Sequence, residues 1–374
     1  MSTNTNTLQV KQYRGLGAAV VGVHNVEQIL NLAGLNWKTV SMPMEIKGNR
    51  ENRPSSFRSL VRSDNGMELG VSSGDYKPVH NEQIVRSMIE AADAAGGMTL
   101  QRIGSLDEGR RIWAIGDVPN HSFKLPVDSM WGEAMNRPHG GGADWIHDDE
   151  TRLKVLMGSG HIPGIAFSIE FMAERLICTN GAKISRIVGR FRMIHSGSFG
   201  DVHKLQIRSL MSRAGEAFQK YAEAAGEMRA THVTAAQGQA FTLQLMQPEV
   251  IVKAAKEGQL PEAVLDIKGD NFNGINTPIL LEKAVKVDFF DPATFSRPVN
   301  RVLELVNLQP GAAMAPATLW NRYNALTYFV DHERGRSADS GMNAAWFGDG
   351  STLKDQALQL ASQYAYVLRG GSRA

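Results

Sequence analysis

The sequence lacks the features by which secreted, membrane and redox proteins are usually recognised. It contains one cysteine, Cys178, in 374 residues, so no disulfide can form within the chain. No apolar run approaches the roughly 18–20 residues that a membrane helix needs. The polar, Thr- and Asn-rich start of the chain also lacks the pattern of a signal peptide. We therefore expect a cytoplasmic protein without a membrane span, whose cysteine is a buried small hydrophobe rather than a nucleophile.

Motifs for nucleotide binding are missing as well. The sequence has no Gly-x-x-x-x-Gly-Lys-Ser/Thr loop, so we expect no ATP site. Gly15-Leu16-Gly17 lacks both the third glycine and the preceding strand of a dinucleotide site. We expect no cofactor. Whether the chain is an enzyme stays open, although the missing motifs favour a protein without catalytic activity.

The strongest feature that is present is a basic segment from Arg175 to Arg213. It contains eight Lys and Arg residues and one acid, Asp201, whereas the whole chain has a net charge of only +2. A balanced protein that gathers positive charge in one segment is typical of proteins that meet an anionic partner. We predict that this partner is nucleic acid, without bound metal, and that the segment binds it through Lys183, Arg186, Arg190, Arg192, His195, Lys204, Arg208 and Arg213.

The spacing of these residues predicts how they are presented. Lys183, Arg186 and Arg190 are three and four residues apart and would share one face of a helix. Lys204 and Arg208 are four apart at the start of a second helix, with Arg213 about a turn later. Side chains arranged in this way along a groove would contact phosphates and make the affinity salt-dependent. The alternative is a solvated helix face or a set of salt bridges between subunits.

A smaller basic cluster lies before and within a predicted hairpin. It comprises Lys47, Arg50, Arg53, Arg58 and Arg62, with Glu51 as the one acid. A basic hairpin with Phe57 nearby suits single-stranded nucleic acid, because bases stack on aromatic rings while phosphates meet arginine. A flexible polar loop explains the same residues equally well. Further possible stacking residues are Tyr76, Trp113, Tyr323 and Trp346, although the helical spacing of Tyr323 indicates a core position.

The periodicity of apolar residues predicts an α+β fold, in which an antiparallel sheet of hairpins is backed by helices and followed by a mainly helical C-terminal part. We expect a disordered lead-in over residues 1–18, an α+β core over 19–230 that binds nucleic acid, and a helical region over 231–374. Within these parts, the predicted helices span residues 25–33, 80–95, 202–229, 249–256, 278–287, 299–306, 319–330 and 353–367. The predicted strands span 37–44 (ending at Pro43), 57–61, 67–71, 99–104, 111–118 and 152–157, while 166–177 is either a strand or a strand–helix junction.

Several motifs along the chain are specific enough to carry a resemblance. They include Arg62-Ser63-Asp64-Asn65-Gly66, Gly109-Arg110-Arg111-Ile112-Trp113-Ala114, Arg175-Leu176-Ile177-Cys178-Thr179-Asn180, Arg192-Met193-Ile194-His195, Leu319-Trp320-Asn321-Arg322-Tyr323-Asn324 and Phe347-Gly348-Asp349-Gly350. Together they make the chain similar to a family of phage- and plasmid-like proteins described as domain of unknown function 932. The resemblance covers most of residues 20–230 and 318–368. It implies a mobile-element setting, and the fold pattern is also loosely similar to phage single-strand annealing proteins.

Three hypotheses for the function follow. The first is a phage or plasmid protein that binds single-stranded DNA, or anneals it, in recombination or replication; it would act as a homo-oligomer and without ATP. The second is a metal-dependent nuclease that uses the acidic residues of 147–150 or 331–333. Neither acidic group has the His-x-x-x-His or Cys-x-x-Cys spacing of a strong metal motif. The third is a non-catalytic, oligomeric interaction protein.

Overall fold

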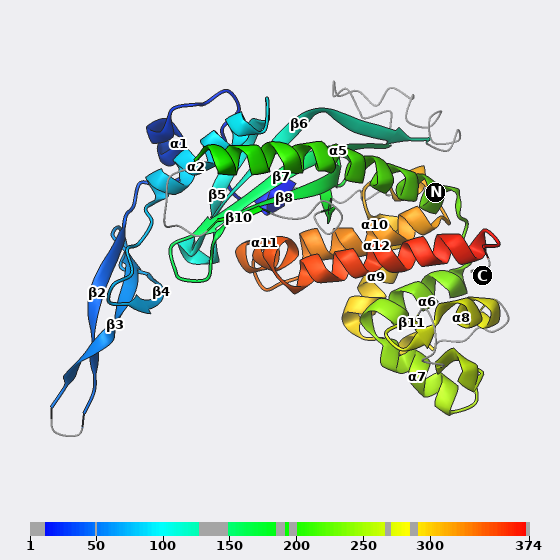
Figure 1. Ribbon diagram of the computed structural model, residues 1–374. Helices are drawn as coiled ribbons and strands as arrows, with labels where there is room; N and C mark the ends of the chain where they lie inside the picture. The colour runs from blue at the N-terminus through cyan, green and yellow to red at the C-terminus, as the bar shows by residue number, and fades with distance from the viewer. Residues whose placement is uncertain are drawn as a thin grey trace, which may run out of the picture.

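The computed structural model describes residues 12–48, 51–126, 149–184, 191–193, 200–265, 271–284 and 291–371. Antiparallel sheets occupy the first half of the chain and helices dominate the second, so the predicted α+β fold is confirmed (Figure 1). In the described part of the chain, no helix is both long and apolar enough to cross a bilayer.

The centre of the molecule is a mixed-length antiparallel sheet. In the described residues its order is β1-β5-β6-β7-β8-β10, and β9 pairs with β8 beside β10. β9 lies opposite residues 172–175 of β8 and β10 opposite residues 167–169, so these two short strands share one edge of the sheet. The strands are β1 (Ala18–Ala19), β5 (Thr99–Leu106), β6 (Arg111–Leu125), β7 (Asp149–Gly160), β8 (Phe167–Arg175), β9 (Asn180–Lys183) and β10 (Phe191–Met193).

Helices cover both faces of this sheet (Figure 1). On one face lie α2 (Asn81–Ala94) and the long α5 (Asp201–Ala230), whose apolar stripes include Ile84 and Val85 in α2 and Leu210 in α5. On the other face lie α10 (Leu319–Tyr328), α11 (Ala338–Phe347) and α12 (Asp349–Leu368). Phe347 of α11 sits so close to Gly158 of β7 that a Cβ at that glycine would touch its ring.

The main hydrophobic core runs through both predicted regions of the chain. It joins sheet residues such as Trp113 and Phe171 to Trp320, Tyr323 and Leu360 of the C-terminal helices. Residue 231 therefore marks a change from sheet to helix but not the end of this core. A second, smaller core lies between α6 (Ala235–Met246), α7 (Pro248–Lys256), α8 (Thr277–Ala284) and α9 (Arg297–Leu308).

Short elements complete the described chain. They are η1 (Gln12–Gly15), α1 (Val26–Leu32), η2 (Asp107–Gly109), η3 (Glu262–Leu265), β11 (Asn271–Phe272), β12 (Ile275–Asn276), η4 (Pro292–Thr294), η5 (Ala312–Met314) and the π-helix η6 (Phe329–Glu333). The expectation of disorder up to residue 18 is wrong for the described part from residue 12 onward, because Tyr13 of η1 is buried against Trp113 and Trp346.

A three-stranded sheet projects from the body, and we call it the arm (Figure 1). It consists of β2 (Thr39–Ile46), β3 (Arg53–Arg62) and β4 (Glu68–Ser73), in the order β2-β3-β4. The predicted hairpin around Asp64-Asn65-Gly66 is confirmed, and Gly66 has the positive φ of 71° that the turn needs. The prediction that β2 ends at Pro43 is wrong, because Pro43 lies in an edge strand, where its missing N–H is not required.

Two further predictions are settled by the sheet. Residues 166–177, for which strand and strand–helix junction were both open, form strand β8 up to Arg175. The predicted helix face of Lys183, Arg186 and Arg190 is wrong for Lys183, which ends strand β9. Arg186 and Arg190 lie outside the described residues.

Candidate functional site

The edge of the sheet at β10 carries positive charge on both faces. Arg192 of β10 is exposed and lies opposite Ser168 of β8, whose hydroxyl is on the face that Phe347 covers. Directly opposed residues of an antiparallel pair point to the same face. Arg192 therefore emerges on the α11 side of the sheet, whereas α5 lies on the other side.

Lys204 and Arg208 lie near the start of α5, the helix that packs on the opposite face of this edge. They lie one helical turn apart near the start of α5, and the first turn of α5 packs on β10, where the rings of His203 and Phe191 are 6.0 Å apart. Arg208 is exposed and makes no ion pair within the described residues. Within the described residues, the one ion pair of Lys204 is a distant contact of 4.0 Å with the exposed carboxylate of Asp201.

Arg111 adds a fourth cation that the sequence interpretation missed. Its guanidinium lies 4.2 Å from the ring centre of Phe347. Burial lowers the pKa of Arg111. The negative charges of Glu170 and Asp107 oppose this effect, and repulsion from Arg192 lowers the pKa of Arg111 further. Arg111 and Trp113 point to one face of β6, and the paired row Trp113–Gly158–Ser168–Arg192 shows that Arg192 lies on the same face of the sheet. We call Arg111, Arg192, Lys204 and Arg208 the basic edge.

The remaining residues of the predicted basic segment fall elsewhere or outside the described residues. Arg213 is exposed, but it is five residues beyond Arg208 and thus about 140° further round α5. Lys183 is placed by its backbone alone, and Arg186, Arg190 and His195 lie in the undescribed stretches on either side of β10. Arg175, the first residue of the segment, is buried and paired with Asp149, so it is not available to a ligand.

The arginines of the arm are engaged to different degrees. Arg53, next to the tip, is exposed. Arg58 donates to the side chain and carbonyl of Ser41 at 2.7 and 3.0 Å. Arg62 pairs with Asp64 at 2.7 Å and lies 4.5 Å from the ring centre of Trp37. Both therefore stabilise the arm itself; Arg50 lies outside the described residues.

Most of the proposed stacking residues are core residues. Trp113, Tyr323 and Trp346 are buried, as was predicted for Tyr323. Tyr76 is half-buried and donates its hydroxyl hydrogen to the carbonyl of His161 at 2.9 Å. Phe57 on the arm, in contrast, is among the most exposed aromatic side chains in the described residues.

The described acidic residues of the first possible nuclease site are paired with arginine side chains of the same chain. Asp149 accepts two hydrogen bonds from Arg175, at 2.5 and 2.8 Å, and one from Trp320 at 2.9 Å. Glu150 pairs with Arg152 at 2.7 Å. His147 and Asp148 lie outside the described residues.

The second acidic group is equally engaged. Asp331 binds Lys354 at 2.6 Å, and Glu333 binds Arg301 at 2.7 Å. His332 makes a 2.7 Å hydrogen bond to the carbonyl of Cys178. Among the described residues, no three His, Cys, Asp or Glu side chains are arranged so that they could hold a metal ion. The two ion pairs join C-terminal helices to one another, and the hydrogen bond of His332 joins them to the turn between β8 and β9.

Two candidate nucleophiles, Cys178 and Ser72, are also buried. Cys178 is buried, as predicted, and burial raises the pKa of its thiol to about 11. The sequence contains one Gly-x-Ser-x-Gly match, Gly70–Gly74, that the sequence interpretation overlooked. Its Ser72 is buried within strand β4 rather than exposed at the strand-to-helix turn that a nucleophile elbow requires.

A buried ionic row crosses the face of the sheet beneath Tyr13. Lys154 of β7 pairs with Asp117 of β6 and, at 3.3 Å, with Glu174 of β8. Burial raises the pKa of Glu174, and Lys154 opposes that rise. Since Lys154 and Glu174 are almost fully buried, this row connects neighbouring strands and is closed to a ligand.

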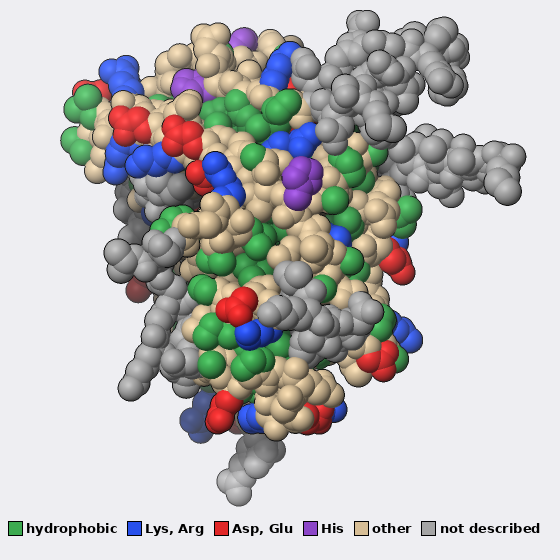
Figure 2. Space-filling model, turned by 90° about the vertical axis from the view of Figure 1, so that its right-hand side faces the viewer, with side chains coloured by type: hydrophobic (Ala, Val, Ile, Leu, Met, Phe, Trp, Pro, Cys, Tyr) green, Lys and Arg blue, Asp and Glu red, His purple; other side chains and the backbone are tan. Residues whose placement is uncertain are grey.

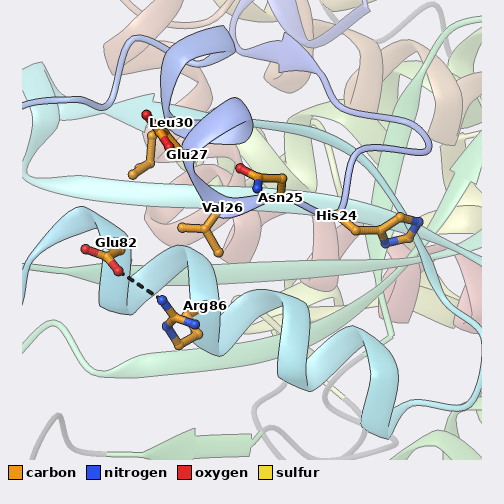
Figure 3. Close-up of a pocket in the computed structure, with 7 residues that line it drawn as sticks. All are labelled: His24, Asn25, Val26, Glu27, Leu30, Glu82 and Arg86. Atoms are coloured by element: carbon orange, nitrogen blue, oxygen red, sulfur yellow. Dashed lines mark hydrogen bonds and ion pairs between the residues drawn. The ribbon is translucent and has the colours of Figure 1, made fainter.

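One pocket of about 500 Å³ lies between α1 and α2 (Figure 3). His24, Glu27 and Leu30 line one side, and Glu82 and Arg86 form an ion pair of 2.9 Å on the other. The pocket lacks a nucleophile beside a base, so its geometry does not indicate catalysis.

Charge is mixed on two other parts of the surface. On the end of the molecule that Figure 2 shows, Lys and Arg side chains lie among Asp and Glu side chains and form no field of one sign. The second half of α5 follows the same pattern, with Glu216, Lys220, Glu223, Glu227 and Arg229, and Glu227 contacts Arg369 at 3.5 Å. The basic edge therefore differs from this mixed surface.

The comparisons with known proteins identify a family but no characterised relative. No curated protein and no solved structure matches the chain. The family model described as "Domain of unknown function (DUF932)" matches residues 68–346, which is more than half of the chain and includes β4, strands β5 to β10 of the central sheet, α5 to α10 and nearly all of α11. The chain therefore belongs to the family defined by this domain of unknown function.

Proposed function

We propose that the protein binds nucleic acid at the basic edge, and that its ligand is single-stranded DNA. The observation that carries this proposal is the pair of exposed arginines Arg192, on the edge strand β10, and Arg208, near the start of the helix α5 that packs on the other side of that strand; neither makes an ion pair within the described residues. Arg111 and Lys204 extend the positive charge on each side. Such charges bind a phosphate backbone and release its counterions.

The two-sided position of these cations favours a single strand. A flexible strand can bend around the edge of the sheet and meet cations on both faces. A DNA duplex has a persistence length of about 50 nm and would meet one face at a time.

The wider role in the proposal is that of a mobile-element protein in recombination or replication, located in the cytoplasm. The resemblance of the motifs to phage- and plasmid-like proteins supports this setting. Annealing of complementary strands needs no nucleotide hydrolysis, because base pairing supplies the free energy. This agrees with a sequence that has no ATP-binding loop.

The test is a charge reversal of the basic edge. A variant with Arg192→Glu and Arg208→Glu should bind fluorescein-labelled single-stranded DNA at least tenfold more weakly than the wild type in fluorescence anisotropy at fixed salt. Because both side chains are exposed, the circular dichroism spectrum and the unfolding midpoint should be unchanged.

A matched control separates the site from the net charge. Lys220→Glu with Arg297→Glu makes the same charge change at two other exposed positions, in α5 and α9. This control should retain most of the affinity. Equal losses in both double variants would show that net charge alone governs binding, and an unchanged affinity in the folded Arg192/Arg208 variant would refute the proposed site.

A further inference from the structure

The arm has one apolar face, and that face points away from the body. The register of its strands places Val40, Met42, Met44 and Ile46 of β2 on the same face as Phe57 and Val61 of β3 and Val71 of β4. In the described part of the chain, no other element covers these side chains: Val40, Met42, Ile46, Phe57 and Val71 are each between 41% and 60% exposed.

The opposite face of the arm packs, near its base, against the body of the same chain. Thr39, Leu60 and Ser72 are buried there, and a Cβ at Gly70 would touch the side chain of Ile162 in the body. Further towards the tip, this face carries Ser41 and Arg58, which bind each other. The arm is thus polar or already packed on one side and apolar on the free side.

The size of the free face indicates that it meets a protein surface. At these exposed fractions its side chains present roughly 400 Å² of apolar area, which is as large as the largest apolar patch of a typical monomer. A single three-stranded sheet also gains stability when its apolar face is packed against a second layer.

The charges at the two ends of this face indicate which surface it meets. Arg53 lies on the apolar face next to the tip, and Glu68 lies on it at the base, opposite Val61. Neither side chain makes an ion pair within the described residues, and both are exposed. Val61 comes eight positions after Arg53 in β3, so the two charges are roughly 26 Å apart.

We propose that the occupant of this face is the arm of a second copy of the chain, related by a two-fold axis with the two arms antiparallel. In this arrangement Arg53 of each copy meets Glu68 of the partner subunit, and the apolar stripes pack as two layers of a sandwich. Parallel arms would instead place Arg53 beside Arg53 of the partner subunit and Glu68 beside Glu68 of the partner subunit. The antiparallel dimer buries about 1,000 Å² in total, which reaches the lower limit of specific interfaces.

The first experiment measures the mass of the full-length protein by light scattering after gel filtration, over a range of concentrations and without nucleic acid. The wild type should form a dimer that dissociates on dilution. Arg53→Glu and Glu68→Arg should each raise the dissociation constant at least fivefold, because each places like charges together. The double variant Arg53→Glu with Glu68→Arg should recover most of the affinity.

A second experiment cross-links introduced cysteines. The single natural cysteine, Cys178, is buried, so it should not compete with an exposed thiol. Ser59→Cys places an accessible thiol in the middle of the apolar face, and Ser56→Cys places one on the opposite face of the same strand. Packed sheets lie about 10 Å apart, so a bismaleimide of that length should join two copies of the Ser59→Cys variant and not of the Ser56→Cys variant.

Three results would overturn the proposal. One is a monomer at every concentration of the wild type, and another is a charge-swapped double variant as weak as the single ones. The third is cross-linking that is equal for the two cysteines or that requires single-stranded DNA, which would assign the face to another surface or to nucleic acid. None of these results bears on the basic edge, which is tested by DNA binding.

Discussion

Asp149 distinguishes a structural acid from a catalytic one. The acidic group that includes Asp149 was one possible metal site of a nuclease, and there Asp149→Ala would abolish cleavage in a stable protein. In the structure the carboxylate of Asp149 instead holds the buried guanidinium of Arg175 and the indole of Trp320. We predict that Asp149→Ala acts on folding.

The magnitude follows from what the substitution leaves behind. Arg175 would stay buried as a cation, and within the described residues its remaining hydrogen-bond partners would be the carbonyl of Gly311, at 3.4 Å, and the sulfur of Cys178, at 3.8 Å. Removing one partner of a buried ion pair costs about 3–5 kcal/mol, and the indole of Trp320 loses its acceptor as well. Substitution of the neighbouring, partly exposed Glu150 should cost less than about 1 kcal/mol.

The assay is unfolding in guanidinium chloride, followed by tryptophan fluorescence. Asp149→Ala should lower the midpoint clearly and Glu150→Ala should leave it nearly unchanged. Asp149→Ala combined with Arg175→Met should recover part of the loss, because no uncompensated charge remains. An unfolding midpoint of Asp149→Ala equal to that of the wild type would refute the structural role.

Two further predictions concern stability. Gly226 lies within α5, and the space that a methyl group would fill there is open, so Gly226→Ala should raise the unfolding free energy by about 1 kcal/mol. Gly341→Ala should lower the unfolding free energy by about 1–3 kcal/mol, because the new Cβ would overlap Arg14 and the carbonyl of Arg334. Urea unfolding checks both, and a reversed order of the two variants would contradict the packing described here. Burial lowers the pKa of His332 in the folded protein below its usual 6.5, so the unfolded chain binds more protons in the window just below pH 6.5. Stability should therefore fall as the pH drops from 7.5 to 5.5, and His332→Gln should flatten this slope; an equal slope in the variant would exclude His332 as its source.

The long, strongly periodic elements could be predicted from the sequence. The apolar repeat over 202–229 and the Asn-Gly turn after β3 specify α5 and the β3–β4 hairpin by local chemistry alone. The helices α6 and α11 were missed. α6 is buried on several sides and includes the buried polar Gln244, which bonds to Tyr364 and Thr277, so it has no clear apolar stripe. The strands β9 and β10 are too short to produce an alternating pattern and exist because β8 offers them an edge.

The candidate site was predictable only in part. Charge counting finds Arg192, Lys204 and Arg208, since they lie in one segment. It also selects Arg175, which is buried and paired with Asp149. The burial of Arg175 depends on Asp149 and Trp320, which are distant in the sequence, so charge counting cannot detect it. It misses Arg111, which is about 80 residues earlier in the chain and comes to the same face of the sheet as Arg192 through the pairing of β6, β7, β8 and β10.

The central claim is most directly tested by titrating labelled single-stranded DNA with the wild-type protein at several salt concentrations, without metal. Each phosphate contact to a single strand should contribute about −0.7 to the slope of log affinity against log salt concentration. If the basic edge binds DNA, the wild type should show tight binding with a steep slope, and Arg192→Glu with Arg208→Glu should make that slope shallower. Absence of binding by the wild type even at low salt would contradict the account.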